Sequence, residues 1–342
     1  GCVGLFNLGN TCFMNAALQC LSNTVPLTQY FLQELYAREI NRENKLGMGG
    51  RVASYYGRHI KEMWRASFPV FPRGVKLVMA RKNPQFEGYQ QQDSQELLMS
   101  LLDGLHEDLC RVKEKPYVQI PDSNGRSDQE VAREHIECYL KRDRSVIVDL
   151  FSGVIKSQIR WPDAPAADNR KFEAFNMLSL PVPEESDIRV DIKMCFKLFT
   201  ETEKLNDEIY CSAVKKHLKA EKKIELFSAP PILVVHLKRL LPRYKIQTYS
   251  AEGKTKGGGG QEAKGGEKPQ QQARGQKSSE KLYDLYAVIN HYGSAYGGHY
   301  VAYAKSKKGG VSGWFCFDDS RVTKIKESEV VTRHAYMLFY KR

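Results

Sequence analysis

The 342-residue chain is 42% hydrophobic and 27% charged, a composition typical of a globular protein and unlike that of a disordered one. Its longest clear apolar run, residues 232–235, has only strand length, so we expect no segment that spans a membrane. The net charge of +12 raises the question of nucleic-acid binding, but there is no arginine-rich helix, aromatic-basic RNA motif or zinc module, and a solvated basic surface explains the charge better.

Eight cysteines are scattered through the chain without a C-x-x-C pair or a secretory leader. This usage favours free thiols in a reducing compartment, so we expect a cytoplasmic or nuclear protein. The chain starts without Met and almost within its main motif, and we therefore expect it to be part of a longer protein.

Residues 4–21 have the features of a reactive thiol at the start of a helix. Apolar residues recur there at the spacing of a buried helical face, and Thr11 or Asn10 is placed to cap the helix. Gly9 allows a sharp turn, so Cys12 falls in the first helical turn, where free N–H groups and the helix dipole favour a thiolate and a low thiol pKa. The alternative is that Cys12 is a small core residue, because a single cysteine needs a histidine beside it to be catalytic.

Residues 1–110 are predicted to form a helical subdomain. After the first helix, apolar periodicity predicts helices at 26–38, 51–68 and 93–109, the last with its leucines on one side. A further short helix is expected at 128–141.

Two acids stand at the start of the helix expected at 93–109. Asp93 at the N-cap and Glu96 at N3 have the residue types and spacing of a capping box, which explains both without invoking function. Gln90, Gln91 and Gln92 just before them are polar and are not explained by a core.

Beyond residue 150 the pattern changes to strands. Residues 154–161 alternate between apolar and polar, which puts Ile155 and Gln158 on opposite faces. Residues 232–240 are continuous enough to form a central strand. Further strands are expected at 178–182, 193–199, 209–211, 283–291, 299–304, 314–318 and 335–340.

Residues 251–280 consist largely of Gly, Lys, Gln, Glu and Ser. Such a segment cannot bury enough apolar surface to order itself. We expect a disordered loop between neighbouring strands, with an end-to-end distance of roughly 30 Å.

A nucleophilic thiol needs a base, and imidazole suits that role near neutral pH. His299 is the first candidate, because Gly297 and Gly298 before it permit close backbone approach and a strand follows it. His291 is the rival, although it lacks this setting and fits a packed or loop histidine. The other six histidines have no such setting either and fit the surface or the core.

A catalytic imidazole is usually held in one orientation by a third group. Asp318 ends the next predicted strand, across a hairpin from His299, so adjacent strands bring the two within reach. The alternative for Asp318 and Asp319 is a strand-ending turn. An oxyanion forming beside the thiol needs hydrogen-bond donors, which the backbone N–H of Cys12 and the side-chain amide of Asn7 can supply.

With these segments in chain order, the sequence resembles the ubiquitin-specific protease family of deubiquitinases. The nearly complete match over residues 4–21 carries the resemblance, together with 90–97, 232–239 and 283–319. It covers essentially the whole chain apart from the low-complexity segment.

The resemblance implies an α+β fold of the papain-like cysteine protease type, with a helical thumb, a β-rich palm and β fingers. One catalytic domain would span residues 1–342, with the thumb at 1–115, the fingers at 150–230 and the palm at 231–342. The low-complexity segment 251–280 would be an insert in the palm.

The resemblance also implies roles for the residues singled out above. Cys12 would be the nucleophile, His299 the general base and acid, and Asp318 the acid that orients His299. Asn7 would belong to the oxyanion hole, and Asp319 would be a supporting or alternate acid.

The implied substrate is ubiquitin, whose basic C-terminal tail ends in Gly-Gly. Asp93 and Glu96 would meet this tail, and Gly298 and Tyr300 would line its channel. Capping a helix and binding the tail are compatible roles for Asp93.

Two departures from the family pattern stand out. The family often has two C-x-x-C pairs at its fingertips, whereas the matching places here read WPDA at 161–164 and CSAV at 211–214. One cysteine of four remains, so we predict no structural zinc from these segments, and no other cofactor. After Arg239 the chain lacks the family's usual Phe-Pro strand and runs into the insert.

Three functions remain to be compared. The first is a thiol isopeptidase that releases ubiquitin from ubiquitinated proteins, acting as a monomer. The second is a catalytically silent ubiquitin-binding module, suggested by the missing zinc ligands. The third, nucleic-acid binding through the net charge, predicts strongly salt-dependent affinity and lacks a supporting motif.

Overall fold

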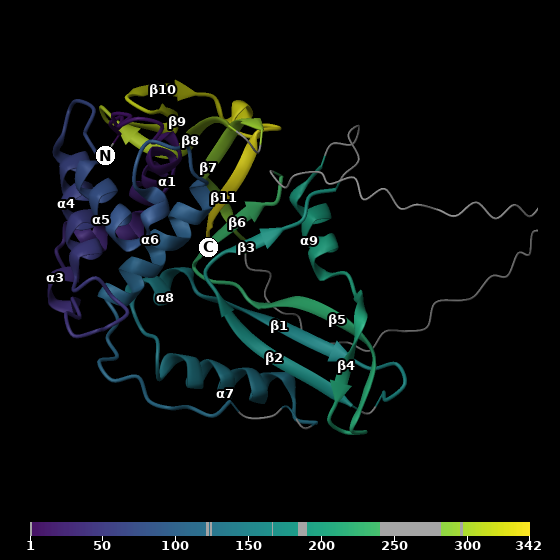
Figure 1. The fold of residues 1–342 in the computed structure, drawn as a ribbon. Helices are drawn as coiled ribbons and strands as arrows, with labels where there is room; N and C mark the ends of the chain where they lie inside the picture. Colours follow the sequence, from purple (N-terminus) through teal and green to yellow (C-terminus); the bar gives the residue numbers. More distant parts are fainter. Residues whose placement is uncertain are drawn as a thin grey trace, which may run out of the picture.

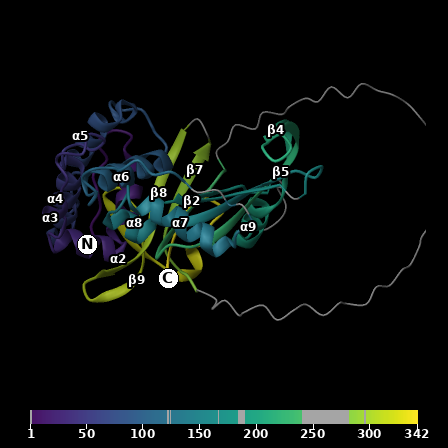
Figure 2. The ribbon, with the colours of Figure 1, turned by 90° about the horizontal axis from the view of Figure 1, so that it is seen from below.

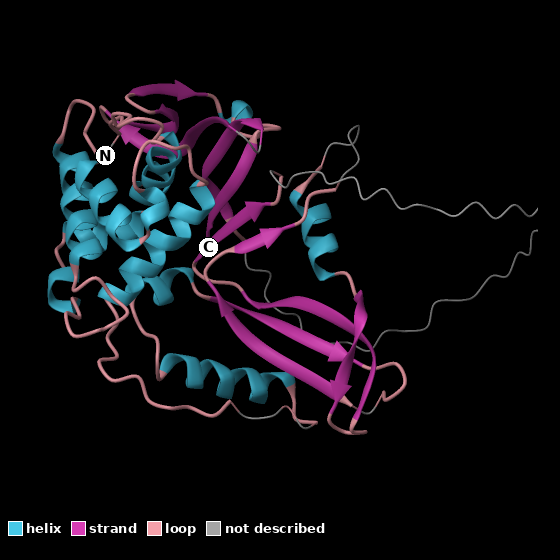
Figure 3. Ribbon diagram, viewed as in Figure 1, coloured by secondary structure: helices cyan, strands magenta, loops and turns pink. Residues whose placement is uncertain are grey.

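The computed structural model describes residues 2–120, 123, 125–165, 167–183, 190–239, 282–294 and 297–342. The helices of the N-terminal part gather on one side of the molecule, and the strands lie on the other together with further helices (Figures 1 and 3). The low-complexity segment expected at 251–280 and the end of the strand expected at 232–240 lie outside the described residues. Within those residues, no helix combines the length and the apolar character that crossing a bilayer requires.

The N-terminal third is helical and is organised around its first helix. Every residue of α1 (Cys12–Ser22) is buried, as expected for a helix at the centre of a core. α1 lies between α6 (Ser94–Asp108) and the strand β8 (Gly297–Lys308) (Figure 1). The elements of this part are α1, α2 (Val25–Leu32), α3 (Tyr36–Glu39), α4 (Arg51–Arg65), α5 (Arg73–Lys82), η1 (Pro84–Phe86) and α6 (Ser94–Asp108).

The helix predicted at 26–38 is wrong as a single element, because α2 ends at Leu32 and Glu34 takes a left-handed φ of 59°. The helix predicted at 51–68 ends earlier, at Arg65, shortly before a proline that disfavours helical backbone at the residue preceding it. The short helix α5, which follows Pro72, was not predicted.

Seven strands form the larger sheet, in the order β10-β9-β8-β7-β11-β6-β3. All neighbouring pairs are antiparallel except β3 with β6, which is parallel. The strands are β3 (Leu178–Leu180), β6 (Ile232–Leu237), β7 (Asp284–Ser294), β8 (Gly297–Lys308), β9 (Val311–Asp318), β10 (Arg321–Ile325) and β11 (Ala335–Lys341), with η2 (Glu327–Glu329) before the last.

A second, four-stranded antiparallel sheet has the order β2-β1-β5-β4. Its strands are β1 (Gly153–Arg160), β2 (Asp168–Phe175), β4 (Glu203–Cys211) and β5 (Lys216–Ser228). The helix α7 (Asp128–Leu140) lies along β2 (Figures 1 and 2), and the short α8 (Val146–Phe151) connects it to the first strand.

One expectation about this region is wrong. Residues 193–199, expected as a strand, belong to α9 (Ile192–Thr200), whose N-cap Asp191 accepts a hydrogen bond from the backbone N–H of Met194 at 2.9 Å. On β1, Gln158 of the polar face is buried. α7 covers that face, and Lys156 of the same strand reaches Asp128 of α7 at 2.8 Å.

Candidate active site

The loop before α1 turns sharply, as Gly9 predicted. Gly9 has a φ of 99° and Asn10 a φ of 53°, so two successive residues are left-handed. Thr11 is the N-cap, but neither it nor Asn10 caps the helix with its side chain, which corrects that part of the prediction. The Thr11 hydroxyl instead accepts a hydrogen bond from the backbone N–H of Leu8 at 2.8 Å, which fixes the loop that leads to Cys12.

The side chain of Asn7 is held from both ends. Its Oδ1 accepts hydrogen bonds from the backbone N–H groups of Gly9, at 2.9 Å, and Thr11, at 3.0 Å. Its Nδ2 donates to Asp319 Oδ2 at 2.9 Å, while Asn15 of α1 donates to the other oxygen of Asp319 at 2.7 Å. An amide nitrogen carries two hydrogens, so one donor of Asn7 remains for a ligand.

His299 and Asp318 lie together, where β8 and β9 diverge. His299 Nε2 is 2.6 Å from Asp318 Oδ1. Because a carboxylate only accepts, Nε2 carries the proton in this bond and Nδ1 is left with a free lone pair. Both side chains are partly exposed, at 42% and 46%.

The thiol of Cys12 lies against the same strand. Cys12 is 2% exposed, and the backbone N–H of Tyr300, the residue after His299, lies close enough to its sulfur to favour the thiolate. Burial raises the thiol pKa above its ordinary value, and the negative charge of Asp319 acts in the same direction, whereas the Tyr300 N–H acts against it. The expected low pKa is therefore wrong for the free protein, and the thiol needs a base to ionise near neutral pH.

Asp93 and Glu96 do not form the expected capping box. Asp93 does cap α6, because its Oδ1 accepts from the backbone N–H of Gln95 at 2.7 Å. Glu96 is exposed and instead accepts a hydrogen bond from Gln85 Nε2 at 3.0 Å. The second oxygen of Asp93 accepts from the Tyr336 hydroxyl at 2.5 Å, a partner that the sequence did not indicate.

Tyr300 is buried beside Asp93. Burial, together with the charge of Asp93, raises the pKa of Tyr300. The ring of His291, the rival histidine, packs 4.4 Å from that of Tyr300. Burial lowers the pKa of His291, so it is a neutral packed side chain, whereas His299 has the carboxylate partner.

Gln91, which the sequence left unexplained, bridges to the strand that carries His299. Its Nε2 donates to Gly298 O at 2.8 Å, and its Oε1 accepts from Gly298 N at 2.9 Å. Position 298 needs glycine, because a Cβ there would lie 2.4 Å from Tyr292 O and 2.6 Å from His291 Nε2.

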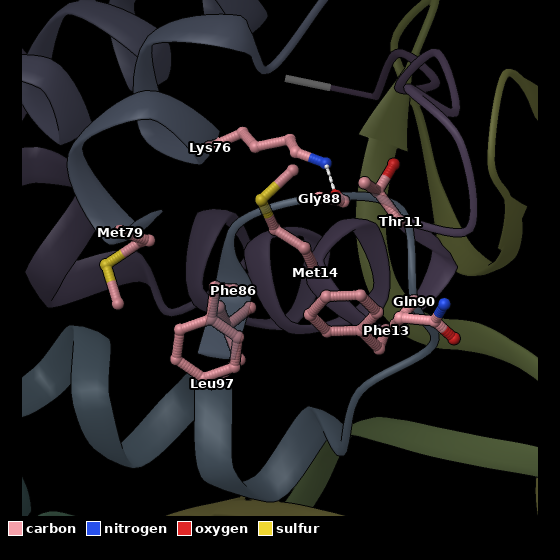
Figure 4. A pocket seen from close by; sticks show the side chains of 9 residues that line it. All are labelled: Thr11, Phe13, Met14, Lys76, Met79, Phe86, Gly88, Gln90 and Leu97. Atoms are coloured by element: carbon pink, nitrogen blue, oxygen red, sulfur yellow. Dashed lines mark hydrogen bonds between the residues drawn. The ribbon is translucent and has the colours of Figure 1, made fainter. Parts of the chain in front are cut away.

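A small cavity lies beside the start of α1, between α1, α5 and the loop before α6 (Figure 4). Its volume is about 10 Å³, and Phe13, Phe86 and Leu97 give it apolar walls. At its rim, Lys76 Nζ donates to Gly88 O at 2.5 Å (Figure 4). Cys12 does not line this cavity, so the cavity is not the place where the thiol would meet a substrate.

Two groups in the described part of the chain have donors arranged as metal ligands are: His106 with Cys110 and Asp143, and His299 with Asp318 and Asp319. The carboxylates of the second group already accept the hydrogen bonds described above. At the tip of the four-stranded sheet, Trp161 and Cys211 pack in an apolar cluster with Ala164 and Ala220. The absence of a structural zinc stays a prediction.

The chain is similar to known proteins over most of its length. The family model described as "Ubiquitin carboxyl-terminal hydrolase" matches residues 3–340. Ubiquitin carboxyl-terminal hydrolase 15 of Rattus norvegicus is 51% identical over 193 residues, and ubiquitin carboxyl-terminal hydrolase 4 of Bos taurus is 54% identical over 193 residues. Each alignment covers 56% of this chain and 20% of the relative, so the matched part is about a fifth of these curated relatives.

Among solved structures, the SAGA Ubp8/Sgf11/Sus1/Sgf73 DUB module bound to ubiquitin aldehyde is similar with a TM-score of 0.65 and 21% sequence identity. The match covers 99% of this chain and 69% of that one. A SAGA DUB module of the same four proteins bound to monoubiquitin gives the same TM-score and identity, over 99% and 68% of the two chains. The expected α+β fold of the ubiquitin-specific protease type is confirmed.

Proposed function

Because this chain belongs to the ubiquitin carboxyl-terminal hydrolase family, we propose that it is a thiol-dependent deubiquitinase. It would cleave the isopeptide or peptide bond after the C-terminal glycine of ubiquitin. The observation that carries the proposal is the position of the Cys12 sulfur against the backbone of Tyr300, next to a His299–Asp318 pair at 2.6 Å. The curated relatives that match this chain are also named ubiquitin carboxyl-terminal hydrolases.

In this proposal His299 activates Cys12. Its free Nδ1 takes the thiol proton, which the raised thiol pKa makes necessary, and the thiolate attacks the carbonyl carbon of the terminal glycine. His299 then gives the proton to the leaving amine, and water hydrolyses the thioester. Asp318 keeps the imidazole in the required tautomer by accepting from Nε2.

The remaining donor of Asn7 and the backbone N–H of Cys12 would stabilise the oxyanion of the tetrahedral intermediate. Asp319 supports this role indirectly, because it fixes the amide of Asn7. Asp93, Glu96, Gly298 and Tyr300 would bind the ubiquitin tail.

The subdomains would follow the family. Residues 1–115 would be the thumb, 150–230 the fingers and 231–342 the palm. Ubiquitin and ubiquitinated proteins would be the partners, the enzyme would act as a monomer without nucleic acid, and it would work in the cytoplasm or nucleus.

The test uses a ubiquitin probe with an electrophile at its C-terminus, together with cleavage of a ubiquitin-tail reporter. We expect the wild-type chain to form a covalent adduct and to cleave the reporter, and we expect Cys12→Ala to do neither. Cys138→Ala is the matched control, because that partly exposed cysteine lies on α7.

Adduct formation or full cleavage by Cys12→Ala would refute the nucleophile. A wild-type chain that binds ubiquitin without adduct or cleavage would instead support the silent binding module.

A further inference from the structure

Two hydrogen bonds join the Gln91 side chain to the Gly298 peptide, and we call this pair the Gln91 bridge. It connects segments 207 residues apart in the sequence. Gln91 belongs to the loop before α6, and Gly298 is the second residue of β8. A carboxamide has one N–H donor and one C=O acceptor side by side, as a peptide group does. The side chain therefore pairs with the strand as a neighbouring strand would.

The bridge occupies a free edge of β8. β9 pairs with β8 only from Ala302, opposite Phe317, to Lys308, so residues 297–301 have no partner in β9. Successive residues of a strand direct their peptide groups to opposite sides. Gly298, Tyr300 and Ala302 therefore present their peptide groups on one edge.

Each of these three positions has a different partner. Gly298 pairs with the Gln91 amide, the N–H of Tyr300 contacts the Cys12 sulfur, and Ala302 lies opposite β9. The Gln91 bridge is thus two residues along the strand from the thiol, roughly 7 Å. An extended peptide laid on this edge would meet Gly298 shortly before its reacting carbonyl reached Cys12.

We propose that Gln91 is a placeholder for the substrate, whose extended C-terminal tail displaces the Gln91 amide and takes over its hydrogen bonds to Gly298. The ligand class is a peptide in extended conformation that ends in Gly-Gly. Such strand addition uses main-chain hydrogen bonds for affinity. This inference rests on the proposed function and adds a residue that determines how readily the tail enters.

The loop that carries Gln91 can move without disrupting the core. Residues 87–91 are all exposed, and Gly88 has a φ of 69° with no atom within 4 Å of where a Cβ would lie. Outside the Gln91 bridge, the loop is held by hydrogen bonds from Lys76 to Gly88 O and from Asn10 to Tyr89 O, and by the exposed Tyr89 ring, which packs on Gly9 and lies under the Lys76 ammonium at 4.9 Å. None of these contacts is to the buried core. Figure 4 shows the loop passing over the apolar cavity beside α1.

The experiment compares Gln91→Ala with wild type on a ubiquitin-tail reporter. Two solvent-exposed neutral hydrogen bonds oppose tail entry, so their removal should raise kcat/KM by about fivefold to tenfold. The gain should come from a lower KM with kcat unchanged. Gln91→Leu keeps the bulk without the polar atoms and should show the same direction.

Gln92→Ala is the matched control, because Gln92 is in the same loop and takes no part in the bridge; its kcat/KM should stay within about twofold of wild type. Alkylation of Cys12 by iodoacetamide should proceed at the same rate in all four proteins, because a small reagent does not need the edge of β8.

A higher KM in both Gln91 variants would overturn the proposal, since it would mean that Gln91 binds the tail. Unchanged kinetics in both would also overturn it, and would leave the proposed function standing if wild type is active. A wild type that neither cleaves the reporter nor labels with the ubiquitin probe would refute the proposed function, and the placeholder with it.

Discussion

Asp319 offers a test in which two measured rates move in opposite directions. The substitution Asp319→Asn removes its charge but keeps its shape and its left-handed backbone, with a φ of 47°, which asparagine tolerates well. Asp319 accepts hydrogen bonds from Asn7 at 2.9 Å and Asn15 at 2.7 Å. An asparagine has one accepting oxygen, so one of the two donors must face an NH₂ group.

The expected loss in turnover follows from the role of Asn7. If Asn7 loses its anchor, its free N–H no longer points at the oxyanion, and losing one such donor costs about 2.7–4 kcal/mol, or a factor of 10² to 10³ in kcat. The ionisation of Cys12 should change in the opposite sense. The charge of Asp319 helps to raise the thiol pKa, so its removal lowers that pKa and increases the thiolate fraction near neutral pH.

The assay pairs kcat on a ubiquitin-tail reporter with the rate of iodoacetamide alkylation at pH 7.5. We expect the variant to turn over more slowly and to be alkylated faster than wild type. If both rates fall together, Asp319 only maintains the fold. If turnover is unchanged, Asp319 does not position Asn7 for the oxyanion.

Three further outcomes are expected. Asp318→Asn should lower kcat by about 10³ to 10⁴ with a nearly unchanged KM for the reporter, because the imidazole loses the acceptor that sets its tautomer; equal turnover would exclude that role. Burial lowers the pKa of His59 to about 4, so the folded protein binds a proton here less readily than the unfolded chain does. The free energy of unfolding should therefore fall as the pH drops from 6.5 toward 4, by about 2 kcal/mol at pH 5. Urea unfolding at pH 7 and pH 5 should show that His59→Leu lacks this component, and parallel losses in both proteins would contradict it. Because an apolar cluster holds the tip of the four-stranded sheet together, a chelator should leave the melting temperature unchanged, and Trp161→Ala should lower the free energy of unfolding by about 3 kcal/mol. Stoichiometric zinc in metal analysis would show that the prediction of no structural zinc is wrong.

Residues with strong local signals were placed correctly from the sequence. Cys12 begins a helix, and His299 and Asp318 meet because their strands neighbour each other across a short hairpin. Asp93 was recognised as an N-cap from its position before an apolar helix.

The errors have physical causes that local patterns do not contain. The thiol pKa of Cys12 was judged from the free N–H groups and dipole of the helix start, whereas burial of the thiol in the folded protein is the largest influence on it. Residues 193–199 also fit a strand, although Ile192, Cys195, Phe196 and Phe199 have helical spacing and Asp191 supplies a cap. Gln91 could not be interpreted, because its partner Gly298 lies on a distant strand.

The backbone of the N-terminal segment pairs with the segment that follows β9, where Leu5 N donates to Asp319 O at 2.8 Å and Gly4 packs against Ser320. A ribosome makes Cys12 287 residues before His299, a delay of roughly 15 to 60 s at ordinary rates of translation. A nascent chain in that interval has the thiol but neither the imidazole nor the Asp318 and Asp319 carboxylates of the folded site, so under the proposed function a product truncated before β8 would be inactive.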